Sequence, residues 1–105
     1  MNDMDLVMAF EHVQKNGLFL KFVGHQLQNE PLIVLAAVQK NGLALQFASP
    51  SMQENNELVL AAVRQNGLAL EYVRLNALDP DDSQEVVMTA LAQIRNAIQS
   101  VLNLG

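Results

Sequence analysis

The sequence predicts an all-α protein, a right-handed, α-solenoid-like stack of helical hairpins that ends in one long C-terminal helix. The phrase I-V-L-A-A-V-Q-K-N-G-L-A-L-Q-F-A at 33–48 returns almost unchanged at 58–73, and a looser copy stands at 8–23. The pair Asn-Gly recurs at one interval, at positions 16, 41 and 66. A fixed period of about 25 residues is typical of stacked units that bury their apolar faces against one another.

The predicted units span residues 5–29, 30–54 and 55–79, and each begins with a long helix. Asp5 or Asp3 is expected to cap the first helix by accepting hydrogen bonds from its free N–H groups. Pro31 suits the first turn of the second helix, where its missing N–H costs nothing. Asn55 or Asn56 is the expected cap of the third helix.

Each Asn-Gly pair is expected to end a long helix. A glycine just after the last turn commonly takes the left-handed conformation, and we expect Gly17 and its two equivalents to do so. The apolar segments 18–23, 43–48 and 68–73 follow. Their alternation is compatible with strands, but their alanines and the lack of partner strands favour short helices.

The C-terminal helix is predicted to span residues 83–103, after a turn at 78–82 and with Ser83 as its cap. The segment 85–91 aligns with 57–63, at an interval slightly longer than the period of the earlier units, so this helix starts a fourth unit. Its apolar residues Val87, Leu91, Ile94, Ile98 and Val101 form a stripe at intervals of four and three. Docking this stripe on the third unit, with a polar face outward, would close the stack. The same spacing is typical of a coiled-coil seam, so a homodimer through this helix is the alternative to a monomer.

Composition limits the possible classes of protein. With 105 residues, half of them apolar and 5% aromatic, the chain forms one domain with a core of Leu, Val, Ala and Met. Ala37 and Ala62 are expected at close helix contacts. The absence of cysteine excludes disulfides and thiolate metal sites. The longest apolar run, 32–38, is too short to span a bilayer. The acidic N-terminal residues indicate no signal peptide, so we expect a cytoplasmic location in the producing cell.

The sequence contains no pattern typical of catalysis, metal binding or cofactor binding. A net charge of −5 with six scattered basic residues argues against nucleic acid as a partner. His12 and His25 belong to no metal-ligand motif, and we expect both to be structural or solvent-exposed. No nucleophile elbow or phosphate-binding glycine loop occurs. We therefore expect no enzyme and no cofactor.

Polar positions that differ between the units but occupy equivalent places predict a protein-binding surface. Such aligned and chemically varied positions determine the choice of partner in repeat proteins. A merely solvated rim is the equally weighted alternative. The candidate residues are Gln14, Lys15, Lys21, Gln39, Lys40, Gln46, Arg64, Gln65 and Glu71.

The phrase V-L-A-A-V-x-x-N-G-x-A-L-x-[Phe/Tyr], at 34–47 and 59–72, resembles the repeat of the family called domain of unknown function 4116. The resemblance covers most of residues 5–75, and it departs from the pattern at Glu11 and His12, where the family has Ala-Ala. It implies a small helical module of the kind found in protist proteins and in effectors that intracellular bacteria secrete into host cytosol. It brings no catalytic residues. We therefore predict a protein-protein interaction module, with a structural or oligomerising protein as the alternative.

Overall fold

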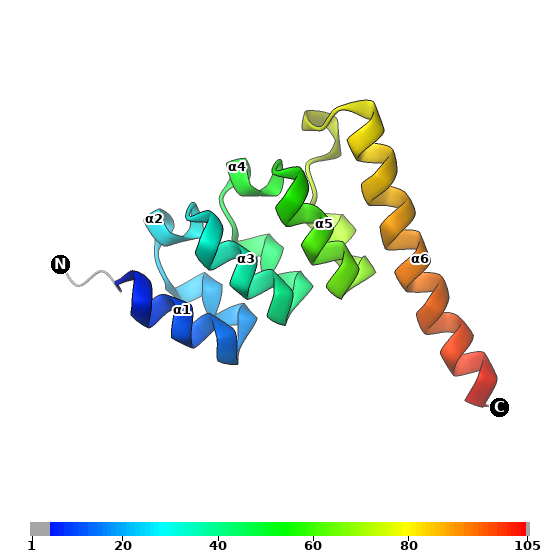
Figure 1. Ribbon diagram of the computed structural model, residues 1–105, viewed down its shortest axis with the longest axis horizontal. Helices are drawn as coiled ribbons and strands as arrows, with labels where there is room; N and C mark the ends of the chain where they lie inside the picture. Colours follow the sequence, from blue (N-terminus) through cyan, green and yellow to red (C-terminus); the bar gives the residue numbers. More distant parts are fainter. Residues whose placement is uncertain (1–4, 105) are drawn as a thin grey trace.

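The computed structural model describes residues 5–104, and this part of the chain contains helices and no strand, which confirms the all-α prediction. Figure 1 shows the helices side by side from one end of the molecule to the other. The Cα atoms extend over 52 × 35 × 15 Å. Because the body is so thin, each helix must obtain much of its burial from the helices at its sides.

One series of elements occurs three times, each time shifted by one full period of the repeat. The long helices are α1 (Leu6–Lys15), α3 (Pro31–Lys40) and α5 (Asn56–Gln65). The 3-10 helices after them are η1 (Gly17–Phe22), η2 (Gly42–Phe47) and η3 (Gly67–Tyr72). The short elements are α2 (His25–Gln28), α4 (Pro50–Gln53) and η4 (Leu75–Ala77), and the chain ends with α6 (Pro80–Leu104).

The long helices form one layer and the 3-10 helices form another, which lies behind the first in Figure 1. In the first layer, α3 packs between α1 and α5, and α6 packs against both α5 and η3. In the second layer, η2 packs between η1 and η3. No helix within residues 5–104 is both long and apolar enough to cross a membrane.

The predicted starts of the long helices are confirmed. The carboxylate of Asp5 accepts a hydrogen bond from the Met8 N–H at 2.8 Å, whereas Asp3 lies outside the described residues. Pro31 is the first residue of α3. Asn55, rather than Asn56, caps α5 and accepts from the Leu58 N–H at 3.2 Å.

The expected left-handed conformation of the Asn-Gly glycines is wrong. Among the described glycines only Gly24 has a positive φ, of 93°. Asn16 instead takes an extended conformation, ends α1, and caps η1 by accepting from the Leu18 N–H at 3.0 Å. The next residue, Gly17, is buried, and a Cβ atom there would overlap the carbonyl oxygen of Ala37 in the following long helix. Glycine is needed at this position for close packing of backbone on backbone.

The apolar segments after the glycines are helical, as predicted. All three adopt the 3-10 form, and the side chain of the preceding asparagine starts each of them. Six residues is long for a 3-10 helix. Since each of these helices packs against the following long helix or α6, tertiary contacts stabilise the conformation.

The predicted start of the C-terminal helix is wrong by three residues. Helix α6 begins at Pro80, and the Ser83 N–H donates to the Asp79 carbonyl at 2.8 Å. Pro80 favours a first helical turn, and Asp81 and Asp82 there interact well with the helix dipole. Ser83 is not the cap, because its hydroxyl donates to the Leu75 carbonyl at 2.9 Å.

The docking face of α6 overlaps only partly with the predicted stripe: Val87 and Ile94 are partly buried, and Ile94 lies against Gly67. Val86 and Ala90 are fully buried, whereas Leu91, Ile98 and Val101 of the predicted stripe are more than half exposed. The expected polar outer face is therefore wrong. Apolar residues cover a wider arc of this helix than docking on α5 and η3 requires.

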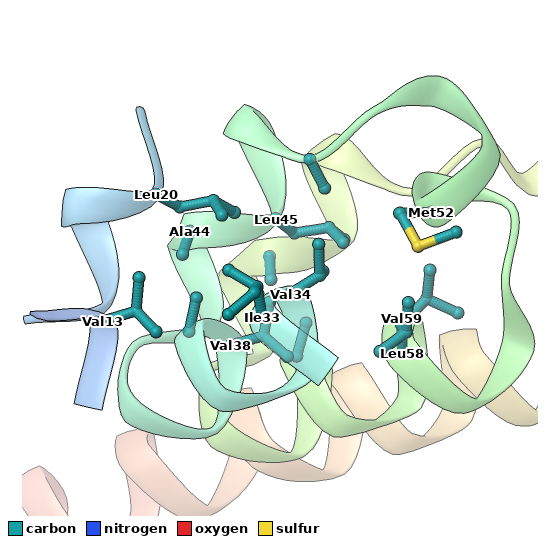
Figure 2. Close-up of a cluster of buried hydrophobic side chains, with 14 of the residues drawn as sticks. Val13, Leu20, Ile33, Val34, Val38, Ala44, Leu45, Met52, Leu58 and Val59 are labelled. Carbon is teal, nitrogen blue, oxygen red and sulfur yellow. The ribbon is translucent and has the colours of Figure 1, made fainter. Parts of the chain in front are cut away.

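The core is made of aliphatic side chains from both layers, and Figure 2 shows Leu20 of η1 beside Ala44 of η2. The predicted central residues Val38, Val63 and Leu45 are fully buried, while Leu70 is partly buried against them. Within the described residues the core contains no polar or charged residue. Its stability therefore depends on apolar burial and close packing.

Two equivalent glutamines tie neighbouring segments together. The Gln28 side-chain amide donates to the Leu20 carbonyl, and that of Gln53 donates to the Leu45 carbonyl, both at 3.0 Å. Their backbone carbonyls accept from the N–H groups of Ser49 and Arg74, respectively. Each glutamine therefore connects its own 3-10 helix to the segment that follows one unit later.

Candidate protein-binding surfaces

All nine residues of the predicted polar surface are exposed. Six lie in the last turns of the long helices, namely Gln14, Lys15, Gln39, Lys40, Arg64 and Gln65. The other three, Lys21, Gln46 and Glu71, lie on the 3-10 helices. The nine residues therefore form two rows, one in each layer of the molecule.

Three members of this surface make specific contacts within the chain. The Lys21 ammonium lies 5.1 Å from the ring centroid of Phe22 and 5.9 Å from that of Phe47. The Gln46 amide donates to the Leu43 carbonyl at 3.0 Å. The side-chain oxygen of Gln65 accepts from the Gly42 N–H at 2.5 Å, so this residue also ties α5 to the preceding unit.

Each of the two middle long helices, α3 and α5, has two buried faces. In α3, Ile33 and Ala37 form one face, and Val34 and Val38 form the other; all four are fully buried. Ala37 lies against Gly17 of the preceding unit, so the first pair faces backward along the chain. The second pair faces the rest of the core, toward the following helices.

In the part of the chain that the structure describes, no helix covers the backward face of α1. Met8 and His12 occupy the positions of Ile33 and Ala37, and both are exposed. The His12 ring stacks on that of Phe19, with centroids 4.7 Å apart, and its Nδ1 lies 2.8 Å from the Met8 carbonyl oxygen. The rings of His12 and Phe19 therefore cover the N-terminal end of the molecule, at the positions that the small residues Ala37 and Ala44 occupy in the middle unit.

Within residues 5–104, no helix covers the forward face of α6. Val86 and Ala90, at the positions of Leu58 and Ala62, are fully buried. Leu91, at the position of Val63, is 51% exposed. Exposed large side chains continue along the same side of the helix to its last turn. We call this surface the free face of α6, and it consists of Met88, Leu91, Arg95, Ile98 and Leu102.

The free face is apolar around one cation. Met88, Leu91, Arg95 and Ile98 line a shallow hollow on the side of α6. Arg95 is the one charged residue of α6 after Glu85. The described residues form a single ion pair, between Arg74 and Glu54, and Arg95 therefore takes part in none. Its guanidinium is therefore free to pair with a carboxylate from outside.

The histidines do not form a metal site in the described part of the chain. His12 stacks on Phe19, and His25 lies in a hollow that Asp5 and Glu30 also line. No three His, Asp or Glu side chains among residues 5–104 come together in a way that could hold a metal ion.

Leu91 and Ile98 of the free face were predicted as a coiled-coil seam in the alternative to docking, whereas Met88, Arg95 and the paired glutamines were not predicted. Gln28 and Gln53 stand one period apart in the printed sequence, and this recurrence was a usable signal. Met88 and Leu91 align with the core residues Leu60 and Val63 of the preceding unit. The alignment of 85–91 with 57–63 therefore shows that α6 retains the apolar residues of a middle helix.

Comparison with family models gives a match over residues 30–76, which span the second unit and most of the third. No curated protein and no solved structure matches the chain. The matched segment begins just before α3 and ends in η4, and it leaves out the first unit and α6. The predicted family resemblance is thus confirmed: residues 30–76 match the family described as Domain of unknown function (DUF4116).

Proposed function

We propose that the chain is a protein-binding module, built as a right-handed, solenoid-like stack of three helical units with α6 at its end. The recurrence of the helix bounds once in every period supports the stack. The free face of α6 supports the binding function. Its four large apolar side chains, Met88, Leu91, Ile98 and Leu102, are 51–67% exposed on one helix. Contiguous exposed apolar surface commonly marks sites of protein interaction.

The two polar rows are the less favoured surface. Exposed Gln, Lys and Arg side chains are well solvated, so they need no partner for stability. Full burial of an exposed Leu or Ile side chain of α6 would instead be worth roughly 1.5–3 kcal/mol of stabilisation. A partner that covers the free face would recover part of this free energy.

Affinity capture with matched variants tests the proposal. The free-face variant carries Leu91→Ser and Ile98→Ser, and the polar-row variant carries Lys15→Glu, Lys40→Glu and Arg64→Glu. We expect a protein that the native chain and the polar-row variant retain and the free-face variant loses. Circular dichroism must show that all three chains have the same helix content. Retention of the same protein by the free-face variant would count against α6 as the binding surface.

Self-association through α6 is the second candidate function. The observation that favours it is the exposure of Leu91, Ile98 and Val101, which belong to the stripe with coiled-coil spacing. Sedimentation velocity over a hundredfold range of concentration tests it. A dimer that forms in the native chain and is lost in the free-face variant would establish this function.

A further inference from the structure

The middle long helices show what kind of element covers a forward face in this molecule. In α3, Val34 and Val38 are fully buried, and α3 packs against the next long helix α5 and its own 3-10 helix η2. The equivalent residues of α5, Val59 and Val63, are also fully buried, and α5 packs against α6 and η3. Helices cover both of these faces.

Helix α6 has an apolar forward face of the same kind, but no helix of the described residues covers it. Leu91 stands at the position of Val63, and no long helix or 3-10 helix follows α6 within residues 5–104. The face then continues through Ile98 to Leu102. From Met88 to Leu102 it runs about 21 Å along the helix axis, at 1.5 Å per residue. A single partner helix of about four turns matches this length.

The position of Arg95 distinguishes a foreign helix from a second copy of α6. Arg95 lies midway between Met88 and Leu102, and α6 has no acidic residue after Glu85. If two copies paired centrally through this face, their Arg95 side chains would approach each other in either orientation. Like charges in a partly dehydrated interface repel strongly. A helix from another protein can instead present a carboxylate, which forms short, charge-assisted hydrogen bonds with a guanidinium.

We propose that the free face of α6 binds an amphipathic α-helix of a partner protein, with large apolar side chains at helical spacing and a carboxylate opposite Arg95. The apolar side chains pack against Met88, Leu91 and Ile98, as α5 and α6 pack on the helices before them. The stem of Arg95 lies in the apolar contact while its guanidinium pairs with the acid. This inference rests on the proposed binding function and specifies the class of partner.

Two fluorescein-labelled, 18-residue helical peptides test the inference on the full chain. Both carry leucines at i, i+3, i+7 and i+10 and differ in one central residue of the apolar face, which is Glu in one and Lys in the other. Fluorescence anisotropy should show that the native chain binds the Glu peptide on the order of tenfold more tightly. Arg95→Glu should reverse the preference, while Ile98→Ser should weaken the binding of both peptides. Arg74→Glu, which changes the charge of an exposed residue in the loop before η4, should leave the preference intact.

Equal affinity for the two peptides, or a preference that Arg95→Glu leaves unchanged, would overturn the inference. Failure of both peptides to bind would also overturn it. A native dimer that is lost with Ile98→Ser and that neither peptide dissociates would show that a second copy is the occupant. In each of these cases the proposed function still stands if the free-face variant loses the protein captured by the native chain. Loss of that capture difference would remove the proposed function itself.

Discussion

Gly42 packs directly on the carbonyl group of Ala62, in the long helix of the next unit. A Cβ atom at Gly42 would overlap the Ala62 oxygen and lie 3.2 Å from both the Ala62 carbonyl carbon and the Asn66 nitrogen. Gly17 and Ala37 form the same contact one unit earlier, and Gly67 and Ala90 form it with α6. The glycine of each Asn-Gly pair therefore sets the distance between one unit and the next.

Gly42→Ala should destabilise the protein by about 1–3 kcal/mol, the usual cost of overpacking. The obstacle is backbone, which cannot rotate away as a flexible side chain could. Urea denaturation followed by circular dichroism measures the change. Gln39→Ala, at an exposed position of α3, is the control and should change stability by less than about 0.5 kcal/mol. Equal stability of the two variants would contradict the close contact.

Gln53→Ala should cost about 0.5–1.5 kcal/mol, because the Leu45 carbonyl loses its side-chain donor. Gln28→Ala should cost a similar amount, since Gln28 makes the equivalent bond to Leu20. Because the two sites lie in different units, the effects should add in the double variant. Thermal denaturation of the single and double variants measures this. Gln99→Ala, at an exposed position of α6, is the control. A cost no larger than that of the control would mean that the two glutamine bonds contribute nothing to stability.

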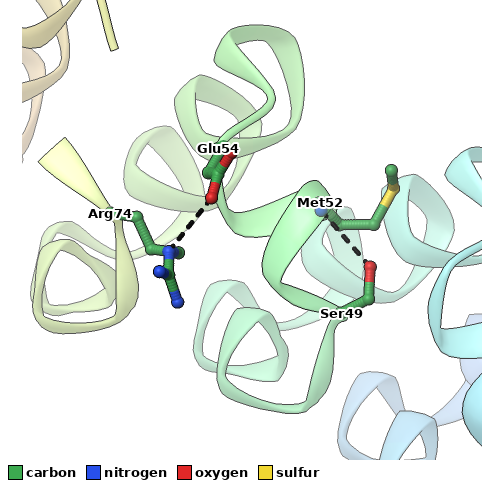
Figure 3. Close-up of polar contacts among 4 residues, drawn as sticks. All are labelled: Ser49, Met52, Glu54 and Arg74. Carbon is green, nitrogen blue, oxygen red and sulfur yellow. Dashed lines mark hydrogen bonds and ion pairs between the residues drawn. The ribbon is translucent and has the colours of Figure 1, made fainter. Parts of the chain in front are cut away.

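Two polar contacts near α4, drawn in Figure 3, should differ in their contribution to stability. Ser49 caps α4 and accepts from the Met52 N–H at 3.4 Å, while Arg74 pairs with Glu54 at 3.2 Å between two exposed side chains. Ser49→Ala should cost about 1 kcal/mol, because it removes both the long cap bond and the hydrogen bond that the Ser49 hydroxyl donates to the Asn29 side-chain oxygen. Arg74→Ala should cost at most about 0.5 kcal/mol, and its effect should vanish in 1 M NaCl. Urea denaturation at low and high salt checks both values.

The ring pair at the N-terminal end should block the stacking of a further unit. His12 and Phe19 replace the alanines Ala37 and Ala44, which are fully buried between units. We would fuse a second copy of residues 30–54 before Asp5, in the native chain and in the variant with His12→Ala and Phe19→Ala. The added unit should raise the melting temperature of the variant by at least about 5 °C, since a new packed interface adds stability. In the native chain the rise should be smaller. Equal rises would show that the rings do not obstruct stacking.

The repeat made much of the fold predictable. Because the same apolar phrase returns at a fixed period, the long helices and the buried residues Val38 and Val63 followed from the sequence. The role of Gly17 did not follow. A glycine after a helix is explained equally well by a left-handed turn and by a close backbone contact, and only the position of Ala37 distinguishes the two.

The face through which α6 docks was not predictable from periodicity alone. Apolar residues occupy more than half of its circumference, so the stripe Val87–Leu91–Ile98 and the pair Val86–Ala90 were both possible docking faces. Gly67 lies against both the Ala90 carbonyl and the Ile94 side chain, so the docking face combines Val86 and Ala90 with Ile94 of the stripe. Docking of the stripe was the main expectation and its exposure as a coiled-coil seam was the alternative, whereas the polar surface stays a prediction of a binding site.

The two faces of α6 should respond differently to substitution. Val86 is fully buried against the body of the protein, so Val86→Ala should cost about 1.5–3 kcal/mol through lost apolar burial and the cavity left behind. Ile98 is 55% exposed, and Ile98→Ala should change the free energy of unfolding by less than about 0.5 kcal/mol. Urea denaturation of both variants, at a concentration where the chain is monomeric, measures the difference. Because both changes shorten an aliphatic side chain on the same helix, helix propensity affects them in the same direction. A large cost at Ile98 with a small one at Val86 would mean that α6 is rotated, and the free face would then lie elsewhere.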